Sequence, residues 1–234
     1  MIDRITENNL YRELLKHPTY GEPGRKYLEL RGITEETIEK WEIGYAPLDY
    51  RPKWSDAKDI FDPYTKMIGR VTFPLYNCNG SLESISGRWA LSENPLKKTK
   101  YDMHKFIKNR LLFGLYQNKY NIRKQNSIII TEGQLDVISA WQNGITNVVS
   151  SFGAHCSLYH LGLAARYCSN IYILYDEDIA GLAGAESIND FSTYGDLNVM
   201  IKTGIFPKGD DLDSFIKKHS KAELEALLNI VSEP

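Results

Sequence analysis

The sequence predicts an α/β protein in which a parallel sheet flanked by helices follows a smaller, mixed α+β N-terminal subdomain. Two observations predict this arrangement. From Ser127 onwards, short apolar runs alternate with helical patterns, an order typical of parallel strands joined by crossover helices. Upstream, two β-rich runs separated by a turn predict an antiparallel hairpin, which follows a stretch with helical spacing.

The N-terminal part, up to about residue 60, has the pattern of short helices. Apolar side chains recur close to helical spacing across Asp3–Lys16, before prolines and glycines interrupt the pattern. A second short helix is expected over Gly24–Arg31. A third begins after Thr34, whose hydroxyl is a favourable N-cap, and ends at Gly44.

A β-hairpin and a further helix are predicted next. The run Gly69–Tyr76 is rich in β-branched and aromatic residues. The turn Asn77–Gly80 follows, and then a second run over Leu82–Trp89, which together indicate a hairpin. A helix is expected over Gly114–Lys124.

Basic residues are concentrated between this hairpin and the parallel sheet. The formal net charge of the chain is −2, which alone does not indicate a nucleic-acid-binding protein. Between residues 94 and 131, however, Asp102 is the one acid beside nine basic residues, namely Lys97, Lys98, Lys100, Lys105, Lys108, Arg110, Lys119, Arg123 and Lys124. Such a segment can bind phosphate groups, although a solvated basic face explains it equally well.

The third part, residues 126 to about 220, alternates strands with helices. The expected strands are Ser127–Thr131, Asn147–Ser151, Ile171–Tyr175 and Leu197–Ile201. The expected helices are Leu135–Asn143, Ser157–Tyr167, Ala180–Phe191 and Leu212–His219, followed by a short final helix over Lys221–Val231. These strands are expected to form one parallel sheet with helices on both faces.

Composition excludes several classes of protein. No stretch approaches the ~20 apolar residues that a membrane-spanning helix needs, and the N-terminus has no apolar signal region. We therefore expect a cytoplasmic location and no membrane partner. The three cysteines, Cys78, Cys156 and Cys168, lack the paired spacing of a zinc ribbon, and their odd number argues against a disulfide framework.

Acidic residues follow three of the predicted strands at the points where the strands end. The groups are Glu132 with Asp136, Asp176 with Asp178, and Asp210 with Asp211 and Asp213. The carboxyl ends of parallel strands meet at one edge of a sheet, where ligands bind in open α/β folds. Carboxylates gathered there would repel one another unless a cation lay between them, and Mg²⁺ favours oxygen ligands. The pattern predicts a divalent-metal site, and two ions there would suit phosphoryl transfer.

Each acidic group alone has a simpler explanation. The helix dipole favours acidic residues at helix N-termini by ~0.3–1 kcal/mol each. Three groups at one edge of one sheet are harder to explain in this way, which favours the metal site.

The residues around these acids resemble the Toprim domain, which DnaG-type bacterial primases share with topoisomerases and some nucleases. The resemblance lies in ITEGQLDVISAWQNGITNVVSSFGA around Glu132 and in ILYDEDIAGLAGAESI around Asp176 and Asp178. The DxDxAG form that starts at Asp176 is similar to primases in particular. The segment KGDDLDSFI, which contains Asp211 and Asp213, resembles a further primase motif.

Upstream segments also resemble the catalytic, RNA polymerase domain of DnaG-type primases. They are YLELRGITEETIEKWEIGYAP from Tyr27, GRVTFPLYNCNGSLESISGR from Gly69 and KYDMHKFIKNRLLFGLYQ from Lys100. Together the similar segments cover residues 25 to about 216 in the family's order. The resemblance implies a catalytic-core subdomain over residues 1–125, a Toprim domain over residues 126–220 and a short C-terminal helix or tail over residues 221–234.

The resemblance assigns roles to individual residues. It implies that Glu132, Asp176 and Asp178 are catalytic. The implied metal ligands are Glu132, Asp136, Asp176, Asp178, Asp211 and Asp213. Basic positions that hold the template or the incoming nucleotide are matched by Arg88, Lys100 and Lys108. Solvated surface charge is the alternative explanation for these three.

The implied activity is template-directed synthesis of short RNA primers on single-stranded DNA by metal-dependent nucleotidyl transfer. The implied cofactor is Mg²⁺ or Mn²⁺, and the implied substrates are ribonucleoside triphosphates. The family's zinc ribbon and helicase-binding domain have no matching segment in the sequence, so we expect a separate zinc-binding subunit and a replicative helicase as partners. A compact primase of this kind would suit a phage.

Two other functions use the same residues. A Toprim-type nuclease would hydrolyse a phosphodiester with the same acids, and the upstream primase-like segments argue against it. A non-catalytic module that binds DNA or the replisome is the second alternative. The intact acids Glu132, Asp176 and Asp178 argue against that module, because an inactive relative could lose them freely.

Overall fold

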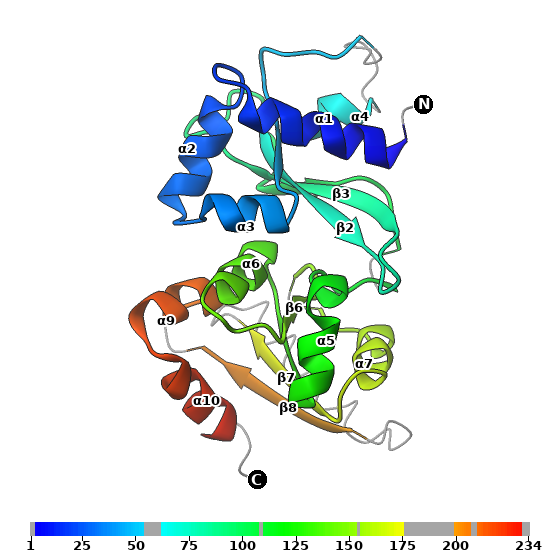
Figure 1. The fold of residues 1–234 in the computed structure, drawn as a ribbon, viewed down its shortest axis with the longest axis vertical. Coiled ribbons are helices and arrows are strands. Elements are labelled where there is room, and N and C mark those ends of the chain that lie inside the picture. Colours follow the sequence, from blue (N-terminus) through cyan, green and yellow to red (C-terminus); the bar gives the residue numbers. More distant parts are fainter. Residues whose placement is uncertain are drawn as a thin grey trace. The chain divides into compact units, whose positions relative to one another are not determined.

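The computed structural model describes residues 3–53, 62–107, 110–153, 155–175, 199–206 and 210–230. The chain divides into two compact units (Figure 1). The N-terminal unit consists of Met1–Tyr76 and Ser81–Phe106, and the C-terminal unit consists of Asn77–Gly80 and Ile107–Pro234. The domain division at residues 125 and 220 that the resemblance implies stays a prediction.

The N-terminal unit contains short helices and an antiparallel sheet. Its helices are α1 (Arg4–Lys16), α2 (Glu22–Leu30), α3 (Glu35–Lys40) and α4 (Pro63–Met67). Its strands are β1 (Gly44–Ala46), β2 (Arg70–Tyr76), β3 (Leu82–Trp89) and β4 (Tyr101–Met103), which pair in this order. The β2–β3 hairpin confirms the predicted pair of strands, with a register shift between Leu75 and Tyr76.

Side-chain caps set the starts of three of these helices. Asp3, Thr34 and Asp62 each accept a hydrogen bond from a backbone N–H in the first turn of the helix that follows. The predicted cap at Thr34 is therefore confirmed. The second helix begins at Glu22, two residues earlier than predicted, because Pro23 is favourable in a first turn.

A fully buried glutamate ties α1 to the segment that follows β4. Glu7 has no exposed surface, and its Oε1 accepts hydrogen bonds from the Tyr11 hydroxyl at 2.7 Å and from His104 Nε2 at 2.8 Å. Its Oε2 accepts from Arg4 Nη1 at 2.6 Å. Burial alone would raise the pKa of Glu7, but the hydrogen bonds from His104, Tyr11 and Arg4 outweigh it and lower the pKa below 4.5.

The lowered pKa of Glu7 makes stability depend on pH in a defined direction. A carboxyl group whose pKa is lower in the folded state stabilises that state above its unfolded pKa, and this stabilisation is lost as the pH falls through the folded pKa. At neutral pH we expect Glu7→Gln to lower the free energy of unfolding by about 2 kcal/mol, the range for hydrogen bonds to a charged group. The difference in the free energy of unfolding between Glu7→Gln and wild type should be constant down to about pH 5 and should shrink below that pH.

Denaturant titrations of both proteins between pH 7 and pH 3 measure this difference. The exposed Glu13, in the interior of α1 itself, provides the matched control, Glu13→Gln, for which the difference in the free energy of unfolding should stay near zero throughout. A Glu7→Gln difference that grew on acidification would contradict the assignment.

The C-terminal unit contains a parallel sheet. Its strands are β5 (Ser127–Thr131), β6 (Val148–Ser150), β7 (Asn170–Tyr175) and β8 (Met200–Ile205), in the order β6-β5-β7-β8. The described helices are α5 (Leu115–Gln125), α6 (Gln134–Gln142), α7 (Leu158–Ala165), α9 (Leu212–Lys218) and α10 (Lys221–Ile230). All paired strands of this sheet run parallel, which confirms the predicted fold class.

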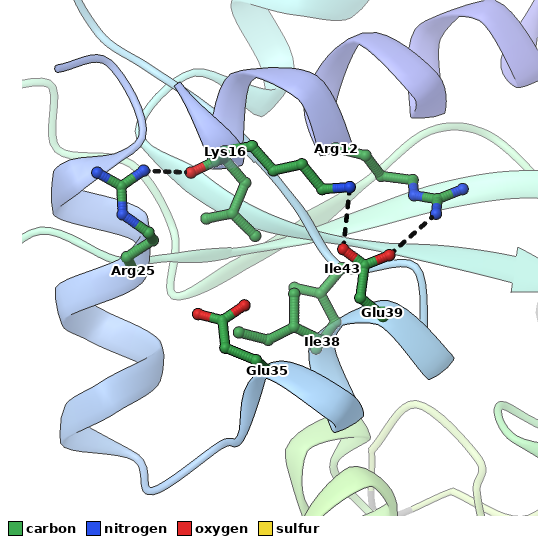
Figure 2. Close-up of a pocket in the computed structure, with 8 residues that line it drawn as sticks. Arg12, Lys16, Arg25, Glu35, Ile38, Glu39 and Ile43 are labelled. Carbon is green, nitrogen blue, oxygen red and sulfur yellow. Dashed lines mark hydrogen bonds and ion pairs between the residues drawn. The ribbon is translucent and has the colours of Figure 1, made fainter. Parts of the chain in front are cut away.

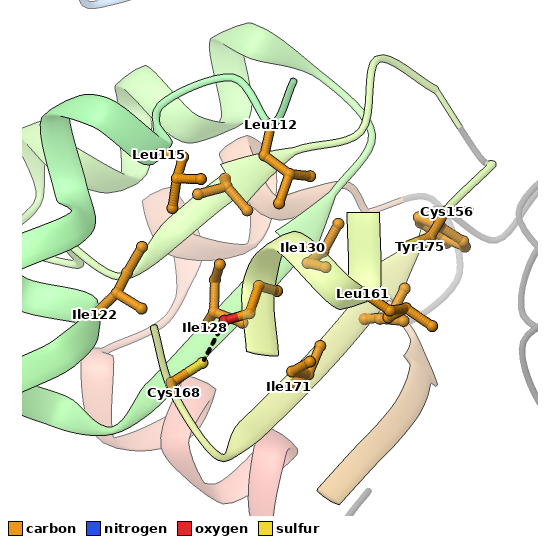
Figure 3. Close-up of a cluster of buried hydrophobic side chains, with 13 residues drawn as sticks. Leu112, Leu115, Ile122, Ile128, Ile130, Cys156, Leu161, Cys168, Ile171 and Tyr175 are labelled. Atoms are coloured by element: carbon orange, nitrogen blue, oxygen red, sulfur yellow. Dashed lines mark hydrogen bonds between the residues drawn. The ribbon is translucent and has the colours of Figure 1, made fainter. Parts of the chain in front are cut away.

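Helices cover both faces of the parallel sheet. One face packs against α5 and α7 in a buried apolar cluster that includes Ile122, Ile128, Leu161 and Ile171 (Figure 3). The chain moves from β5 to β6 in one direction and from β6 to β7 in the other. Because such crossovers are right-handed, α6 lies on the face opposite α7. Helix α9 packs against α6.

Some elements differ from the predictions. The fourth strand of the parallel sheet starts at Met200 and runs to Ile205, whereas Leu197–Ile201 was predicted. Strands β1 and β4, with three residues each, and the short helix α4 were not predicted. The predicted helix Ala180–Phe191 lies outside the described residues. Among the helices that the structure describes, none is long and apolar enough to cross a membrane.

Candidate functional site

Glu132 lies at the carboxyl end of β5, where the backbone is held by two hydrogen bonds. The Ser150 hydroxyl donates to the Glu132 carbonyl oxygen at 2.6 Å, and the Gly153 N–H donates to the same oxygen at 3.0 Å. Ser150 ends the neighbouring strand β6. The turn that carries Glu132 is therefore fixed to the sheet, and the carboxylate is half-buried at its edge.

Glu132 lies level with the end of β7. Strands β5 and β7 pair in parallel with Ile130 opposite Ile173, and Glu132 and Tyr175, the last residue of β7, each lie two residues further along. Burial raises the pKa of Tyr175, and the negative charge of Glu132 raises it further. Asp176 is the next residue in the sequence after Tyr175. The strand ends that carry Glu132 and precede Asp176 are therefore brought together.

Asp136 is buried in the first turn of α6. Its Oδ2 accepts a hydrogen bond from the Gly133 N–H at 3.0 Å, which closes the N-terminus of the helix. A Cβ at position 133 would lie 2.6 Å from that oxygen, so a larger residue there would displace the carboxylate. Asp136 therefore caps the N-terminus of α6, as acids commonly do in the first turn of a helix.

Asp211 and Asp213 lie at the start of α9. Asp211 Oδ1 accepts from the Ser214 N–H at 2.7 Å and caps the helix. Asp213 is buried and its Oδ2 accepts from Lys217 Nζ at 2.8 Å. Helices α6 and α9 both follow strands of one parallel sheet and pack on each other, so their N-terminal acids belong to the same edge.

The predicted metal site includes residues inside and outside the described ranges. Asp176, Asp178 and Lys108 lie outside the described residues. Among the residues that are described, no three His, Cys, Asp or Glu side chains are grouped closely enough to hold a metal ion. The predicted ligands are all carboxylates, a set of oxygen donors that fits Mg²⁺ or Mn²⁺.

Arg88 packs against Tyr101 in the N-terminal unit. Its guanidinium carbon lies 5.0 Å from the ring centroid of Tyr101, the residue that pairs with it across β3 and β4. Burial works against the charged form of Arg88, but Tyr101 and Tyr27 favour it and raise the pKa of the guanidinium. Lys100, directly before Tyr101, is exposed. Lys100 lies just before β4. Successive positions along extended backbone point to opposite faces, so Lys100 is close to Arg88 in backbone position but does not share the face that Arg88 and Tyr101 occupy.

Arg70 supports this basic region, and the sequence analysis did not single it out. The side chain is fully buried at the start of β2. Its Nη2 donates to the Thr99 carbonyl at 2.8 Å, and its Nη1 donates to the Lys100 carbonyl at 3.2 Å and to the Gly87 carbonyl at 3.3 Å. Arg70 therefore fixes the backbone that carries Lys100. The signal in the sequence is Gly87, where a Cβ would lie 2.9 Å from Arg70 Cδ.

A pocket between α1, α2 and α3 contains none of the predicted site residues (Figure 2). Lys16 Nζ pairs with Glu39 at 2.9 Å, and Arg12 pairs with the same carboxylate at 3.6 Å. Arg25 donates to backbone carbonyls at the end of α1, including that of His17 at 2.8 Å. These charges hold a helix junction together.

Part of the chain matches a known protein family. Residues 129–216 match the Toprim-like family. The chain therefore carries a Toprim-like domain, on the parallel sheet that bears Glu132.

The rest of the chain is similar to one group of proteins with this domain. It is 30% identical over 222 residues to the DNA primase of Halalkalibacterium halodurans, a match that covers 85% of this chain and 36% of that primase. It is similar to the structure of the DnaG catalytic core, with a TM-score of 0.81, 27% identity, and coverage of 96% of this chain and 77% of that one. For the DnaG primase catalytic domain bound to ssDNA the TM-score is 0.80, with 26% identity and coverage of 96% and 78%.

The chain is thus a relative of the catalytic core of DnaG-type primases, and the resemblance stated from the sequence is confirmed. The two sheets and their helices are those of the DnaG core fold. The chain spans between 36% and 49% of the length of curated relatives that it matches.

Proposed function

We propose that this chain synthesises short RNA primers on a single-stranded DNA template. The observation that carries the proposal is the position of Glu132, level with Tyr175 in the parallel pairing of β5 and β7 and therefore next to the point where the DxD sequence Asp176–Asp178 begins. The similarity to DnaG catalytic cores over nearly the whole chain supports polymerisation in preference to the other activities of Toprim domains.

In this proposal the carboxylates at the sheet edge hold divalent ions. The ligands would be Glu132, Asp136, Asp176, Asp178, Asp211 and Asp213. Bound Mg²⁺ or Mn²⁺ would supply positive charge to the triphosphate and to the developing pyrophosphate. The carboxylates would position these ions, and Glu132 would serve as the catalytic acid or as one of the metal ligands.

The basic residues of the N-terminal unit bind the nucleic acid in this proposal. Arg88 presents a half-buried guanidinium over the ring of Tyr101, and Arg70 fixes the backbone at Lys100. Together with Lys108 they would contact template phosphates or the incoming nucleotide, so binding should weaken steeply as the salt concentration rises. A relative has been seen bound to ssDNA, which supports this template. A separate zinc-binding subunit and a replicative helicase complete the proposed partners.

A primer-synthesis assay tests the proposal. The chain is incubated with single-stranded DNA, labelled ribonucleoside triphosphates and Mg²⁺ or Mn²⁺, with and without an added zinc-binding primase domain. Short RNA products are expected. Omitting the nucleotides and labelling the DNA tests the nuclease alternative. Shortened DNA without RNA synthesis would replace the primase assignment with a Toprim nuclease. DNA binding without either reaction would indicate a non-catalytic module.

Asp211 allows the capping role to be separated from the metal role. Asparagine caps a helix about as well as aspartate, whereas alanine costs about 1 kcal/mol. We expect Asp211→Ala to lower the melting temperature by about 2–4 °C and Asp211→Asn to leave it unchanged. Both variants should reduce primer synthesis, because both remove a carboxylate from the metal-binding edge. Full activity of Asp211→Asn would limit Asp211 to the cap.

A further inference from the structure

We propose that one face of α5 is a contact surface for single-stranded DNA, separate from the predicted basic residues of the N-terminal unit. The surface, the α5 stripe, consists of Tyr116, Lys119, Tyr120, Arg123 and Lys124. That the ligand is single-stranded DNA rests on the proposed function. The α5 stripe would be a second DNA-binding surface, beside the edge of the sheet that carries the acidic residues.

The stripe follows from helical spacing. Its members are three, four, seven and eight residues apart from Tyr116, so they share one face of the helix. The opposite face carries the buried residues Leu115, Asn118 and Ile122, which hold α5 against the sheet. Tyr120 is 73% exposed, and Arg123 and Lys124 are exposed as well.

All charged residues of the α5 stripe are basic. Helix α5 contains three basic residues and no acid. Within the described parts of the chain, no carboxylate forms an ion pair with Lys119, Arg123 or Lys124. Arg166 adds a further exposed cation close to Tyr167. Such a surface complements a polyanion, because nothing on the helix neutralises its charge.

Aromatic rings accompany the cations. Lys119 Nζ lies 4.6 Å from the ring centroid of Tyr116, and the Arg123 guanidinium carbon lies 4.7 Å from that of Tyr167. Lys119 also donates to the Cys78 carbonyl at 3.0 Å, and the Tyr116 ring packs on Gly80, so this end of the stripe is fixed. Tyr120 remains open for stacking. Basic groups interleaved with tyrosines suit single-stranded nucleic acid, whose phosphates and bases both need partners.

The position of the stripe connects it to the acidic edge. Phe113, just before α5, pairs with Ser150 at the carboxyl end of β6, and the Ser150 hydroxyl holds the carbonyl of Glu132. From there α5 runs back along the sheet to Asn126, directly before β5 begins. The stripe therefore starts at the edge that carries Glu132 and leads away from it by about 12 Å, at 1.5 Å per residue.

Equilibrium binding of a fluorescent oligo(dT) to the full chain tests the inference. It is measured in EDTA without nucleotides, so that the result does not depend on catalysis. Tyr120→Ala should weaken binding at least about fivefold, because it removes a stacking platform, and Tyr120→Phe should restore binding. Lys124→Ala should weaken binding and lower the slope of log K against log salt by about 0.7, the value for one lost phosphate contact on a single strand.

Two matched variants serve as controls. Tyr159, 70% exposed on the uncharged helix α7, gives Tyr159→Ala, and the exposed Lys40 of α3 gives Lys40→Ala. Neither should change the affinity. Tyr120→Ala and Lys124→Ala with wild-type affinity would overturn the inference and leave the primase assignment to its own assay. An equal loss of binding in Tyr120→Ala and Tyr159→Ala would also overturn the inference, as would a loss of binding in Tyr120→Phe.

Discussion

Replacing Glu132 by glutamine is expected to reduce primer synthesis about 1,000-fold, the scale on which loss of one charge-stabilising group lowers a rate. Glu132 lies at the end of β5, where Ser150 and Gly153 hold its backbone, and level with Tyr175 at the end of β7. Glutamine keeps the shape of the side chain and these backbone contacts but removes the negative charge. Asp176→Asn and Asp178→Asn should have losses of the same order, measured as initial rates on single-stranded DNA.

Melting temperatures show whether Glu132→Gln loses activity because it is less stable or because it no longer binds divalent ions. Without divalent ions, Glu132→Gln should unfold at the wild-type temperature or above it, since it removes one of several like charges. Mn²⁺ should raise the melting temperature of wild type but not of the variant, because a ligand that binds only the folded state stabilises it. Glu223→Gln, on α10 of the same unit, serves as the matched control and should retain full activity. Glu132→Gln with more than a tenth of wild-type activity would contradict the assignment.

Replacing Arg70 by methionine is expected to give the largest loss of stability. Methionine retains the apolar stem but removes the donors to the carbonyls of Thr99, Lys100 and Gly87. Hydrogen bonds to a charged group contribute ~1.5–3 kcal/mol each and do not add fully, so we expect a loss of about 3 kcal/mol. The melting temperature should fall by about 6–12 °C. Binding of single-stranded DNA should weaken too, because the backbone at Lys100 is released.

The control for Arg70 is a less buried arginine of the same unit. Arg51 donates to the Thr65 hydroxyl at 3.1 Å and lies 3.9 Å from an Asp62 oxygen. Arg51→Met should cost less than Arg70→Met, because the Arg51 side chain is partly exposed, its ion pair with the buried Asp62 is long, and Asp62 keeps its hydrogen bond from the Thr65 N–H. Arg70→Lys should recover only part of the loss, because one ammonium group cannot reach carbonyls that the guanidinium contacts through separate nitrogens. Equal losses for Arg70→Met and Arg51→Met would show that Arg70 does not hold this region together.

The elements that the sequence predicted well have strong local signals. The short apolar run Ser127–Thr131 predicts strand β5. The turn Asn77–Gly80, which follows a run rich in β-branched and aromatic residues, predicts β3 over Leu82–Trp89. Strands β1 and β4 carry no such signal, since three residues are too few to show a period. Their pairing with β2 and β3 depends on contacts between distant parts of the chain.

The candidate site was predictable in part, because some of its residues also have strong local signals in the sequence. A carboxylate directly after a buried strand is visible in the sequence, so Glu132 was found without knowledge of its surroundings. Its support by Ser150 and its proximity to Tyr175 arise from the order of strands in the sheet, which no local pattern determines. Arg70 was missed because an arginine is usually exposed, whereas here backbone carbonyls satisfy its buried donors.

The central claim is that Glu132 and the DxD acids bind divalent ions at one edge of the parallel sheet. Anomalous diffraction from crystals of this chain grown in Mn²⁺ tests it most directly. The account predicts a manganese peak at about 2.1 Å from carboxylate oxygens of Glu132 and of Asp176 or Asp178, a distance typical of such ions. A manganese-saturated crystal with these carboxylates apart and no peak beside Glu132 would contradict it.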